Sequence, residues 1–591
     1  MKDSGVSAAG ASRRMAVTLV IAGVIAAVFG TKLLLIRGDG SPVPTNDQWG
    51  SEARVLYLPY ADHNLKAKYF WVPHNEHRVV FTRLVNFSLT VANRQWDPRL
   101  EMTVNALIHA GLAGALLAFA AGFARGARLA LPAAVVLAVF MVPYAWENTL
   151  GGFQSQFYFL CWAALGHIWL CLTAMPLDRR WWAGYAVGAL GLGTMASGFL
   201  APAAVLAALV LDVARRRRMT QAEGRAAGLL VVLCLAGVLL VHQVPGASVY
   251  KAQSVGDWLR SSAVAFGRPI GLYLPGALCL QLPMAILAMG LVSGRRSGGR
   301  DLALLGLGVW CWAQMASLSY SRSEILGVPR YGDLYAISIV ANTVALVRLL
   351  DGRRAWAAVA PLWIVVVGVG LCGVFLRAAG YLADYRILEA AKARRVREYV
   401  ATGNLSLIMS APPAELPYNE PGTLALMLSH PTIRSLLPAQ LRLPIALKAS
   451  PDSRGFSGPS EWAASSGPAR FVSLPLPQRR LPVIQLTYLG GPAVAYLQFD
   501  DARSRPVRLE GPPGEWRESR LFAGSGPGAR LVIEVPPGAG AFAFRDPAEV
   551  GLYSWMAEGM LARGAWVLAI GVGLTALGGA MGLRRPAGAP A

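Results

Sequence analysis

Three kinds of residue are scarce in this chain, and each scarcity limits what the chain can be. Only 33 Asp and Glu stand against 55 Lys and Arg, and 7 histidines serve all 591 residues. All 6 cysteines lie in apolar runs, so the polar parts of the chain are expected to hold no disulfide framework and no cysteine-based zinc site. A glycine-rich P-loop is also missing, which excludes ATP hydrolysis on this chain.

Apolar residues are abundant instead. Hydrophobic residues make up 54% of the chain, and its mean hydropathy is +0.44. Runs of about 20 apolar residues are long enough to cross roughly 30 Å of hydrocarbon as helices. We predict an α-helical polytopic membrane bundle of about twelve spans, near residues 15–36, 103–123, 129–146, 156–176, 181–197, 200–214, 226–242, 269–293, 302–318, 334–350, 355–376 and 560–583.

The distribution of basic residues predicts the orientation of these spans, because short cytoplasmic loops collect Lys and Arg. Basic residues gather in alternate connections: Lys2, Arg13, Arg14; Arg125, Arg128; Arg179, Arg180; Arg215 to Arg218; Arg295, Arg296, Arg300; Arg353, Arg354; and Arg584, Arg585. Both termini are therefore expected in the cytoplasm, with the chain embedded in a bacterial cytoplasmic (inner) membrane. The first span lacks a small-residue cleavage site and is predicted to be an uncleaved anchor.

Two connections on the predicted outer side are long. The first covers residues 37–102, and the second, 377–557, begins with the basic helical run "YRILEAAKARRVREYVATGN". Beyond residue 450 come short alternating runs, "RFVSLPL", "VIQLTYL", "AVAYLQF", "ARLVIEV" and "GAFAFRD", between Gly- and Pro-rich turns. This pattern predicts a β-sandwich. We therefore expect a bundle over 1–376, an extracytoplasmic domain over 377–557, and a final helix with a cytoplasmic tail over 558–591.

Polar side chains collect in the connections of this predicted outer face. They are Asp47 and Trp49 of "NDQW", Asp62 and His63 of "YADHN", His74, Asn75, Glu76, His77 and Arg78 of "HNEHR", Glu147, Asn148, Gln154 and Gln156 of "WENTLGGFQSQF", and Arg322, Arg330, Tyr331 and Asp333 of "SYSRSEILGVPRYGDLY". Ionisable groups near a bilayer usually face a polar cavity or one another, and they mark function. We expect these side chains to meet in one site.

The order of these motifs resembles a family of bacterial polytopic proteins similar to the GT-C superfamily of glycosyltransferases. The resemblance rests on Asp-x-Trp, His-Asn-Glu-His-Arg and Gly-Gly-Phe-Gln after a first span, covers mainly residues 15–160, and has a weaker echo at 430–438. It implies a polyprenyl-phosphate sugar donor, a glycan or lipid acceptor, and an acidic base at Asp47. Where such proteins often have Asp-Glu-Trp, this chain has Gln48. A sandwich before the last span is similar to carbohydrate-binding domains of arabinosyl and mannosyl members.

Displacing a polyprenyl phosphate needs a base for the acceptor hydroxyl and cations for the leaving phosphate. Asp47 is the predicted base, with Glu76 second. Arginine binds phosphate bidentately, so Arg322, Arg330 and Arg78 are the predicted phosphate ligands. Sugar or acceptor contacts are assigned to Trp49, Asp62, His63, His74, Asn75, His77, Glu147, Asn148, Gln154 and Tyr331. A single displacement of this kind inverts the anomeric centre.

Each assignment has a structural alternative. The "HNEHR" motif could instead be a cap that pins the loop to the bundle, or His63, His74 and His77 beside Glu76 could form a metal site without a fourth ligand. Asp47 could cap a helix, and Arg322 and Arg330 could be lipid anchors. Glu147, Gln154 and Gln156 could make contacts between spans, and His109 and His167 could pack in the core. No definite cofactor is predicted, and a divalent cation stays open. For the whole chain, the alternatives are a lipid-linked saccharide transporter or flippase, which favours ionisable groups near span centres, and a non-catalytic polysaccharide-assembly protein.

Overall fold

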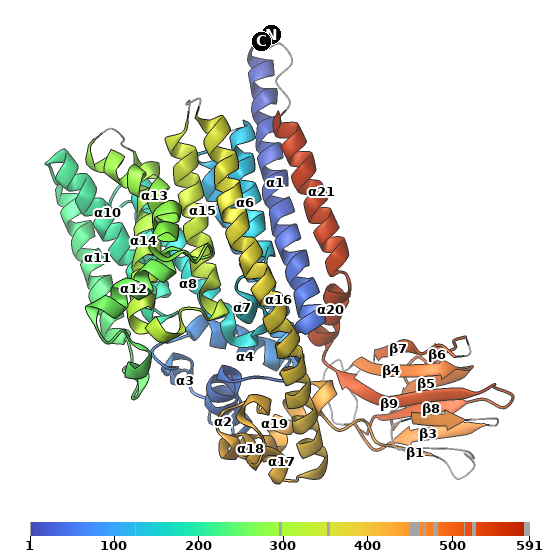
Figure 1. Ribbon diagram of the computed structural model, residues 1–591. Helices are drawn as coiled ribbons and strands as arrows, with labels where there is room; N and C mark the ends of the chain where they lie inside the picture. Colours follow the sequence, from blue (N-terminus) through green and yellow to red (C-terminus); the bar gives the residue numbers. More distant parts are fainter. Residues whose placement is uncertain are drawn as a thin grey trace.

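The protein is a helical bundle with a separate domain of strands at one end (Figure 1). The computed structural model describes residues 2–124, 126–294, 298–351, 355–449, 461–464, 468–476, 483–500, 502–512, 514–522 and 528–583. The first helix begins and the last helix ends at the end of the bundle opposite the strands. We call that end the terminal end and the other the domain end.

Ten helices within the described residues are long and apolar enough to cross a membrane. They are α1 (Lys2–Asp39), α5 (Pro98–Ala121), α8 (Ser155–Thr173), α10 (Leu200–Arg216), α11 (Gln221–Leu240), α13 (Tyr273–Val292), α14 (Gly299–Ser321), α15 (Gly332–Leu349), α16 (Trp356–Thr402) and α21 (Gly564–Leu583). Each corresponds to one of the predicted spans, and together they make the chain a multi-pass membrane protein.

The two remaining predicted spans form shorter helices. Residues 129–146 give α6 (Ala130–Met141), which ends just before Pro143, and residues 181–197 give α9 (Arg179–Gly191). After α9 the chain turns sharply, since a side chain at Gly198 would meet the carbonyl of Gly191. A prediction of twelve full-length spans is therefore wrong at these two places, where proline and glycine end the helices early.

Some of the predicted basic connections lie at the same end of the bundle as the two chain termini. Arg215 and Arg216 close α10, and Arg300 opens α14, both at the terminal end (Figure 1). The predicted orientation residues Arg125, Arg295, Arg296, Arg353, Arg354, Arg584 and Arg585 lie outside the described residues. Which side of a membrane the terminal end faces stays a prediction.

Helices α1 and α21 lie side by side along most of their length (Figure 1). Glycines allow the close approach: a Cβ on Gly571 would lie 2.2 Å from the backbone nitrogen of Ala27, and one on Gly30 would lie 2.3 Å from that of Leu568. Small residues let helix backbones pack closely where lipid removes the hydrophobic driving force. The last span is thus held to the first.

Gly571→Leu should detach α21 from α1, because its side chain has no space against the α1 backbone. The expected result is loss of disulfide cross-linking between cysteines placed on the facing sides of the two helices. Gly573→Leu is the matched control, since nothing lies within 4 Å of a Cβ there. Equal cross-linking in both variants would contradict this packing.

Helix α16 has 47 residues, which at 1.5 Å per residue is about 70 Å, more than twice the hydrocarbon thickness. Its second half therefore projects beyond the domain end (Figure 1). It ends at Gly403, whose φ of 68° is the left-handed conformation common after helices. The domain start predicted at 377 falls inside this helix, because no proline or turn interrupts it there.

The projecting half of α16 and the first outer loop share one hydrophobic core. The loop contributes Trp49, Leu56, Tyr57 and Trp96, and the segment after α16 contributes Ile408, Leu424, Leu428 and Ile433. The helices involved are α2 (Leu58–Ala61), α3 (Lys68–Trp71), α4 (Val80–Asn93), α17 (Ser406–Met409), α18 (Pro421–Ser429) and α19 (Pro431–Leu436), with a π-type segment at Gln48–Tyr57. Segments over 300 residues apart therefore form one small helical domain at the domain end.

The strands form two antiparallel sheets around a common core. One sheet has the order β1-β3-β8-β5-β6 and the other β2-β9-β4-β7. Their bounds are β1 (Leu447–Ala449), β2 (Glu461–Ala464), β3 (Ala469–Ser473), β4 (Val483–Gly490), β5 (Ala493–Gln498), β6 (Val507–Leu509), β7 (Arg517–Phe522), β8 (Arg530–Val535) and β9 (Phe542–Val550). The five alternating runs noted in the sequence coincide with β3, β4, β5, β8 and β9. A short helix, α20 (Leu552–Ala562), leads from β9 to α21.

Candidate functional site

A polar cavity of about 550 Å³ lies at the domain end. The first outer loop, the short helix α7 (Trp146–Leu150), the α14–α15 connection and the projecting part of α16 all line it. Four predicted site residues are among its lining residues: Asp47, Glu147, Gln154 and Arg330. We call this space the Asp47 cavity.

Asp47 is held by His74, whose Nε2 lies 3.2 Å from its Oδ1. Burial alone would raise the pKa of Asp47, but the hydrogen bond from His74 and the positive charge of Arg330 lower it below its usual value. Asp47 is therefore ionised at neutral pH, the state that a general base needs.

The "HNEHR" motif is a tight turn and not a helix. The amide of His74 donates to the carbonyl of His77 over 2.8 Å, and the reverse bond measures 2.9 Å, with Asn75 at φ 49° and exposed. His77 Nδ1 accepts from the Ala196 amide over 3.1 Å. Burial lowers the pKa of His77 to about 4, so it is neutral at pH 7. The turn thus pins the loop to the bundle and presents His74 to Asp47.

The alternative metal site is not assembled. It assumed that His74 and His77 share a helical face, and His63 lies in a separate exposed turn with φ 57°. Within the described ranges, no group of three His, Cys, Asp or Glu side chains is placed to hold a metal ion.

Glu76 and two of the predicted phosphate ligands lie outside the Asp47 cavity. Glu76 Oε2 accepts from Arg322 Nη2 over 2.8 Å; burial favours a raised pKa for Glu76, but the Arg322 charge outweighs it and lowers that pKa. Arg78 donates to the carbonyls of Leu240, at 3.2 Å, and Trp71, at 3.3 Å. These contacts join the turn to neighbouring segments.

Arg330 does line the cavity. Its Nε donates to Glu147 Oε2 over 3.1 Å, and burial raises the pKa of Glu147 despite that charge. The fully buried Asn148 donates to the backbone carbonyl of Arg330 and to Asp333, each over 2.7 Å. Asn148 therefore positions Arg330 and does not reach the cavity.

Three predicted sugar contacts are placed elsewhere. Trp49 is wholly buried in the small helical domain, where its Nε1 donates to the Pro44 carbonyl over 2.6 Å, so it is a core residue and the predicted sugar contact is wrong. Asp62 lies 3.6 Å from His430 on the outside of that domain. Tyr331 is only 5% exposed and packs against Phe157.

A second layer of carboxylates lies behind the cavity, and the sequence analysis missed it. Gln48 donates to Glu101 over 2.7 Å, and the fully buried Glu52 accepts from Asn86 and Trp96 over 2.5 and 2.9 Å. Burial raises the pKa of Glu52 to about 7. An acidic residue five positions after Asp47 in "NDQWGSE" was the available signal.

Glu52→Gln should change how stability depends on pH. A carboxyl whose pKa rises from 4.5 to about 7 on folding makes the folded state bind the extra proton, so its contribution to stability falls as pH rises through that window, on the order of 3 kcal/mol in total. Thermal unfolding between pH 5 and 8 should show the variant gaining on the wild type as pH rises. The exposed Glu324→Gln gives the reference slope, and a parallel slope for Glu52→Gln would refute the buried carboxyl's role.

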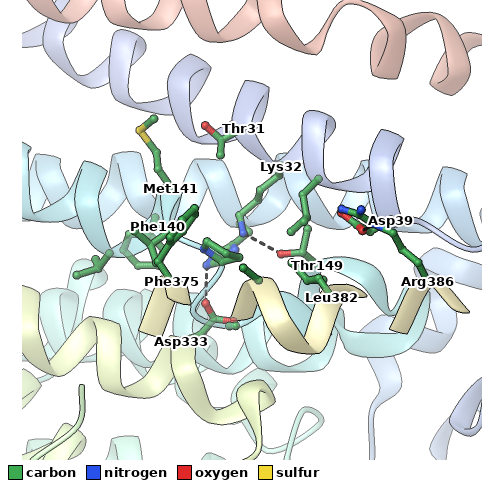
Figure 2. A pocket seen from close by; sticks show the side chains of 17 residues that line it. Thr31, Lys32, Asp39, Phe140, Met141, Thr149, Asp333, Phe375, Leu382 and Arg386 are labelled. Carbon is green, nitrogen blue, oxygen red and sulfur yellow. Dashed lines mark hydrogen bonds and ion pairs between the residues drawn. The ribbon is translucent and has the colours of Figure 1, made fainter. Parts of the chain in front are cut away.

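A second cavity of about 360 Å³ lies inside the bundle, and Figure 2 shows the side chains that line it. The side chains of Phe140, Met141, Phe375 and Leu382 supply apolar walls. Buried among them, Lys32 Nζ donates to Thr149 over 3.0 Å, and His109 Nε2 lies 3.0 Å from Asp333. At one side Arg386 pairs with Asp39. We call this space the Lys32 cavity. Both histidines pack in the core as the alternative predicted. His109 is buried and stacks on Tyr158 with ring centroids 4.2 Å apart, although it also lines this cavity. His167 bonds the Gly184 carbonyl.

The two cavities follow one another along α16. Phe375, Leu382 and Arg386 line the Lys32 cavity, and Tyr385, Glu389 and Lys392 line the Asp47 cavity. Positions three and four apart share a helix face, so one side of α16 passes both spaces. Helix α7 also contributes to both linings, with Thr149 on the Lys32 cavity and Glu147 on the Asp47 cavity.

The fold and the two cavities define a multi-pass membrane protein with a polar chamber at one end of its bundle. No protein-family model, curated protein or solved structure matched the chain.

Proposed function

We propose that this chain is an integral-membrane glycosyltransferase. It would move a sugar from a polyprenyl-phosphate donor to an envelope glycan, lipid or protein acceptor at the outer face of the bacterial cytoplasmic membrane. The observation that carries the proposal is the adjacency of an apolar-walled cavity inside the bundle, holding a buried lysine, and a polar cavity holding an ionised carboxylate. A lipid-linked sugar has a matching order of parts: an apolar chain that ends in a phosphate, followed by a polar sugar.

The donor phosphate is assigned to Lys32, with Arg330 on the sugar side. Lys32 is only 7% exposed, and one of its hydrogens goes to Thr149. The carboxylate whose charge acts on Lys32 is Asp333, and Asp333 already lies 3.0 Å from His109 and accepts from Asn148. A buried ammonium is costly unless an anion pairs with it, and a phosphate entering from the lipid side supplies that anion. Arg78 and Arg322, which are bonded elsewhere, lose this assignment.

Asp47 is assigned as the base. It takes the proton of the acceptor hydroxyl while the new bond forms between that oxygen and the anomeric carbon, and the bond from that carbon to the phosphate oxygen breaks. The electron pair leaves with the polyprenyl phosphate, whose charge Lys32 and Arg330 stabilise. His74 orients the carboxylate throughout. Attack from the side opposite the leaving group inverts the anomeric centre.

The proposal is tested with the full chain in lipid nanodiscs. Polyprenyl-phosphate sugars labelled in the sugar are added with envelope glycolipid acceptors, and release of polyprenyl phosphate is measured with the labelled product. Transfer that depends on Asp47 supports the proposal. Absence of transfer with every donor tested, from protein that still binds polyprenyl phosphate, counts against it.

Transport of a lipid-linked saccharide is the second candidate. The buried group of Lys32, His109 and Asp333 within the spans favours it, since transporters carry ionisable residues inside the bilayer. Proteoliposomes distinguish the two functions. A transporter moves a labelled lipid-linked saccharide between leaflets and makes no new bond. A transferase forms a new glycosidic bond and moves no saccharide between leaflets. A protein that does neither would be a non-catalytic assembly factor.

A further inference from the structure

Two residues that line the Asp47 cavity each carry a buried polar atom with no hydrogen-bond partner among the residues that the structure describes. These atoms are Nε1 of Trp146 and Oε2 of Glu389. Both side chains line the cavity, and their residues are 8% and 5% exposed. Most buried polar atoms are paired, and leaving one unpaired costs about 1–3 kcal/mol. Two such atoms on residues that line one cavity indicate a ligand that pairs with both.

The surroundings of these atoms narrow the chemistry of that ligand. Glu389 Oε1 already accepts from Lys392 over 2.7 Å, so only Oε2 is open, as an acceptor. Trp146 Nε1 can only donate. Hydroxyl groups can serve both atoms, because a hydroxyl donates as well as accepts. A phosphate oxygen has no proton to give to Glu389, and the two negative charges would repel.

Two aromatic rings belong to the same cavity lining. The rings of Trp146 and Tyr385 meet edge to face, with centroids 5.3 Å apart. Glu389 follows Tyr385 by one helical turn on α16, so their side chains are neighbours. Aromatic rings supply rigid apolar area against which the C–H face of a sugar ring packs.

We propose that Trp146, Tyr385 and Glu389 form a binding site for an uncharged pyranoside, whose hydroxyls donate to Glu389 Oε2 and accept from Trp146 Nε1. The site is on the same cavity as Asp47. It deepens the proposed function by naming the acceptor's class, and it rests on that function only in being called an acceptor site.

Binding is measured directly, without turnover. Saturation-transfer NMR titrations use methyl α- and β-pyranosides of glucose, galactose and mannose with the full chain in nanodiscs. Trp146→Phe keeps a ring but removes the N–H, and we expect it to weaken binding about 5-fold. Glu389→Gln removes a charged acceptor, and we expect a loss of at least about 10-fold, in line with the greater strength of hydrogen bonds to charged groups.

Lys392→Gln is the matched control. It breaks the ion pair with Glu389 but leaves Oε2 in place, so pyranoside binding should stay within about 2-fold of wild type. Thermal unfolding of all variants reports whether they are folded.

The outcomes separate this site from the proposed reaction. Pyranoside binding that falls in Trp146→Phe and Glu389→Gln supports the site even if no transfer is ever detected. Wild type that binds none of the pyranosides, or variants that bind them as wild type does, overturns the site. Transfer that depends on Asp47 but has an unchanged acceptor KM in both variants overturns the site and leaves the transferase standing.

Discussion

Asp47→Asn should lower the transfer rate by about 10³-fold while the protein stays folded. Asparagine has the same shape and its oxygen can still accept from His74, but it cannot take a proton, and general-base catalysis contributes about 10²–10⁴-fold. The loss should appear in kcat, with little change in the donor KM, because the carboxylate acts on the acceptor hydroxyl. Single-turnover transfer of labelled sugar in nanodiscs measures it.

Asp62→Asn is the control for this prediction. Asp62 also lies on the first outer loop, but it is exposed and pairs with His430 away from the cavity, so transfer should be unchanged. Because the pKa of Asp47 is lowered, its base form is lost only as pH falls below the ordinary carboxyl range, and the rate should not decline with this group between about pH 5 and 8. Full turnover in Asp47→Asn would refute its role.

Lys32→Gln should weaken binding of a polyprenyl monophosphate by about 10- to 100-fold. The variant removes the buried positive charge of Lys32, which lies among the apolar walls of the cavity where the phosphate would enter. A hydrogen bond between charged groups is worth about 1.5–3 kcal/mol. Fluorescence titration with a labelled polyprenyl phosphate measures the dissociation constant.

The neutral polyprenol and inorganic phosphate complete this experiment. Wild type should prefer the polyprenyl phosphate over the alcohol, and Lys32→Gln should lose that preference while binding the alcohol as before. Inorganic phosphate should compete poorly, because the apolar walls contribute to binding. Lys32→Arg keeps the charge and should stay within a few-fold of wild type. An undiminished preference for the phosphate in Lys32→Gln would show that this lysine does not bind it.

The local elements of the fold could be predicted because their signals are local. Alternating residues marked β3, β4, β5, β8 and β9, and apolar runs marked the long helices. The small helical domain could not be found in this way. Its core joins Trp49 and Trp96 to Leu424 and Ile433, and no periodicity within either segment reveals a partner over 300 residues away.

The residues of the candidate site also divide into those that the sequence could predict and those that it could not. The motifs predicted that Asp47, His74, Glu147 and Arg330 lie together at one end of the bundle, and the structure places them there. Trp49 was misassigned because the local sequence does not show whether a tryptophan next to an acidic residue faces a cavity or a core. Lys32 and Glu389 were missed because each is one of several charged residues in a long helix, and only packing decides which of them faces a cavity.

The most direct test of the two-cavity account is a cryo-EM structure of the full chain in nanodiscs with a polyprenyl phosphate bound. The account predicts density for the chain along Phe140, Phe375 and Leu382, and for the phosphate within hydrogen-bond distance of Lys32, on the side that leads to Asp47. Density for the phosphate at another surface, with the Lys32 cavity filled only by water, would contradict it.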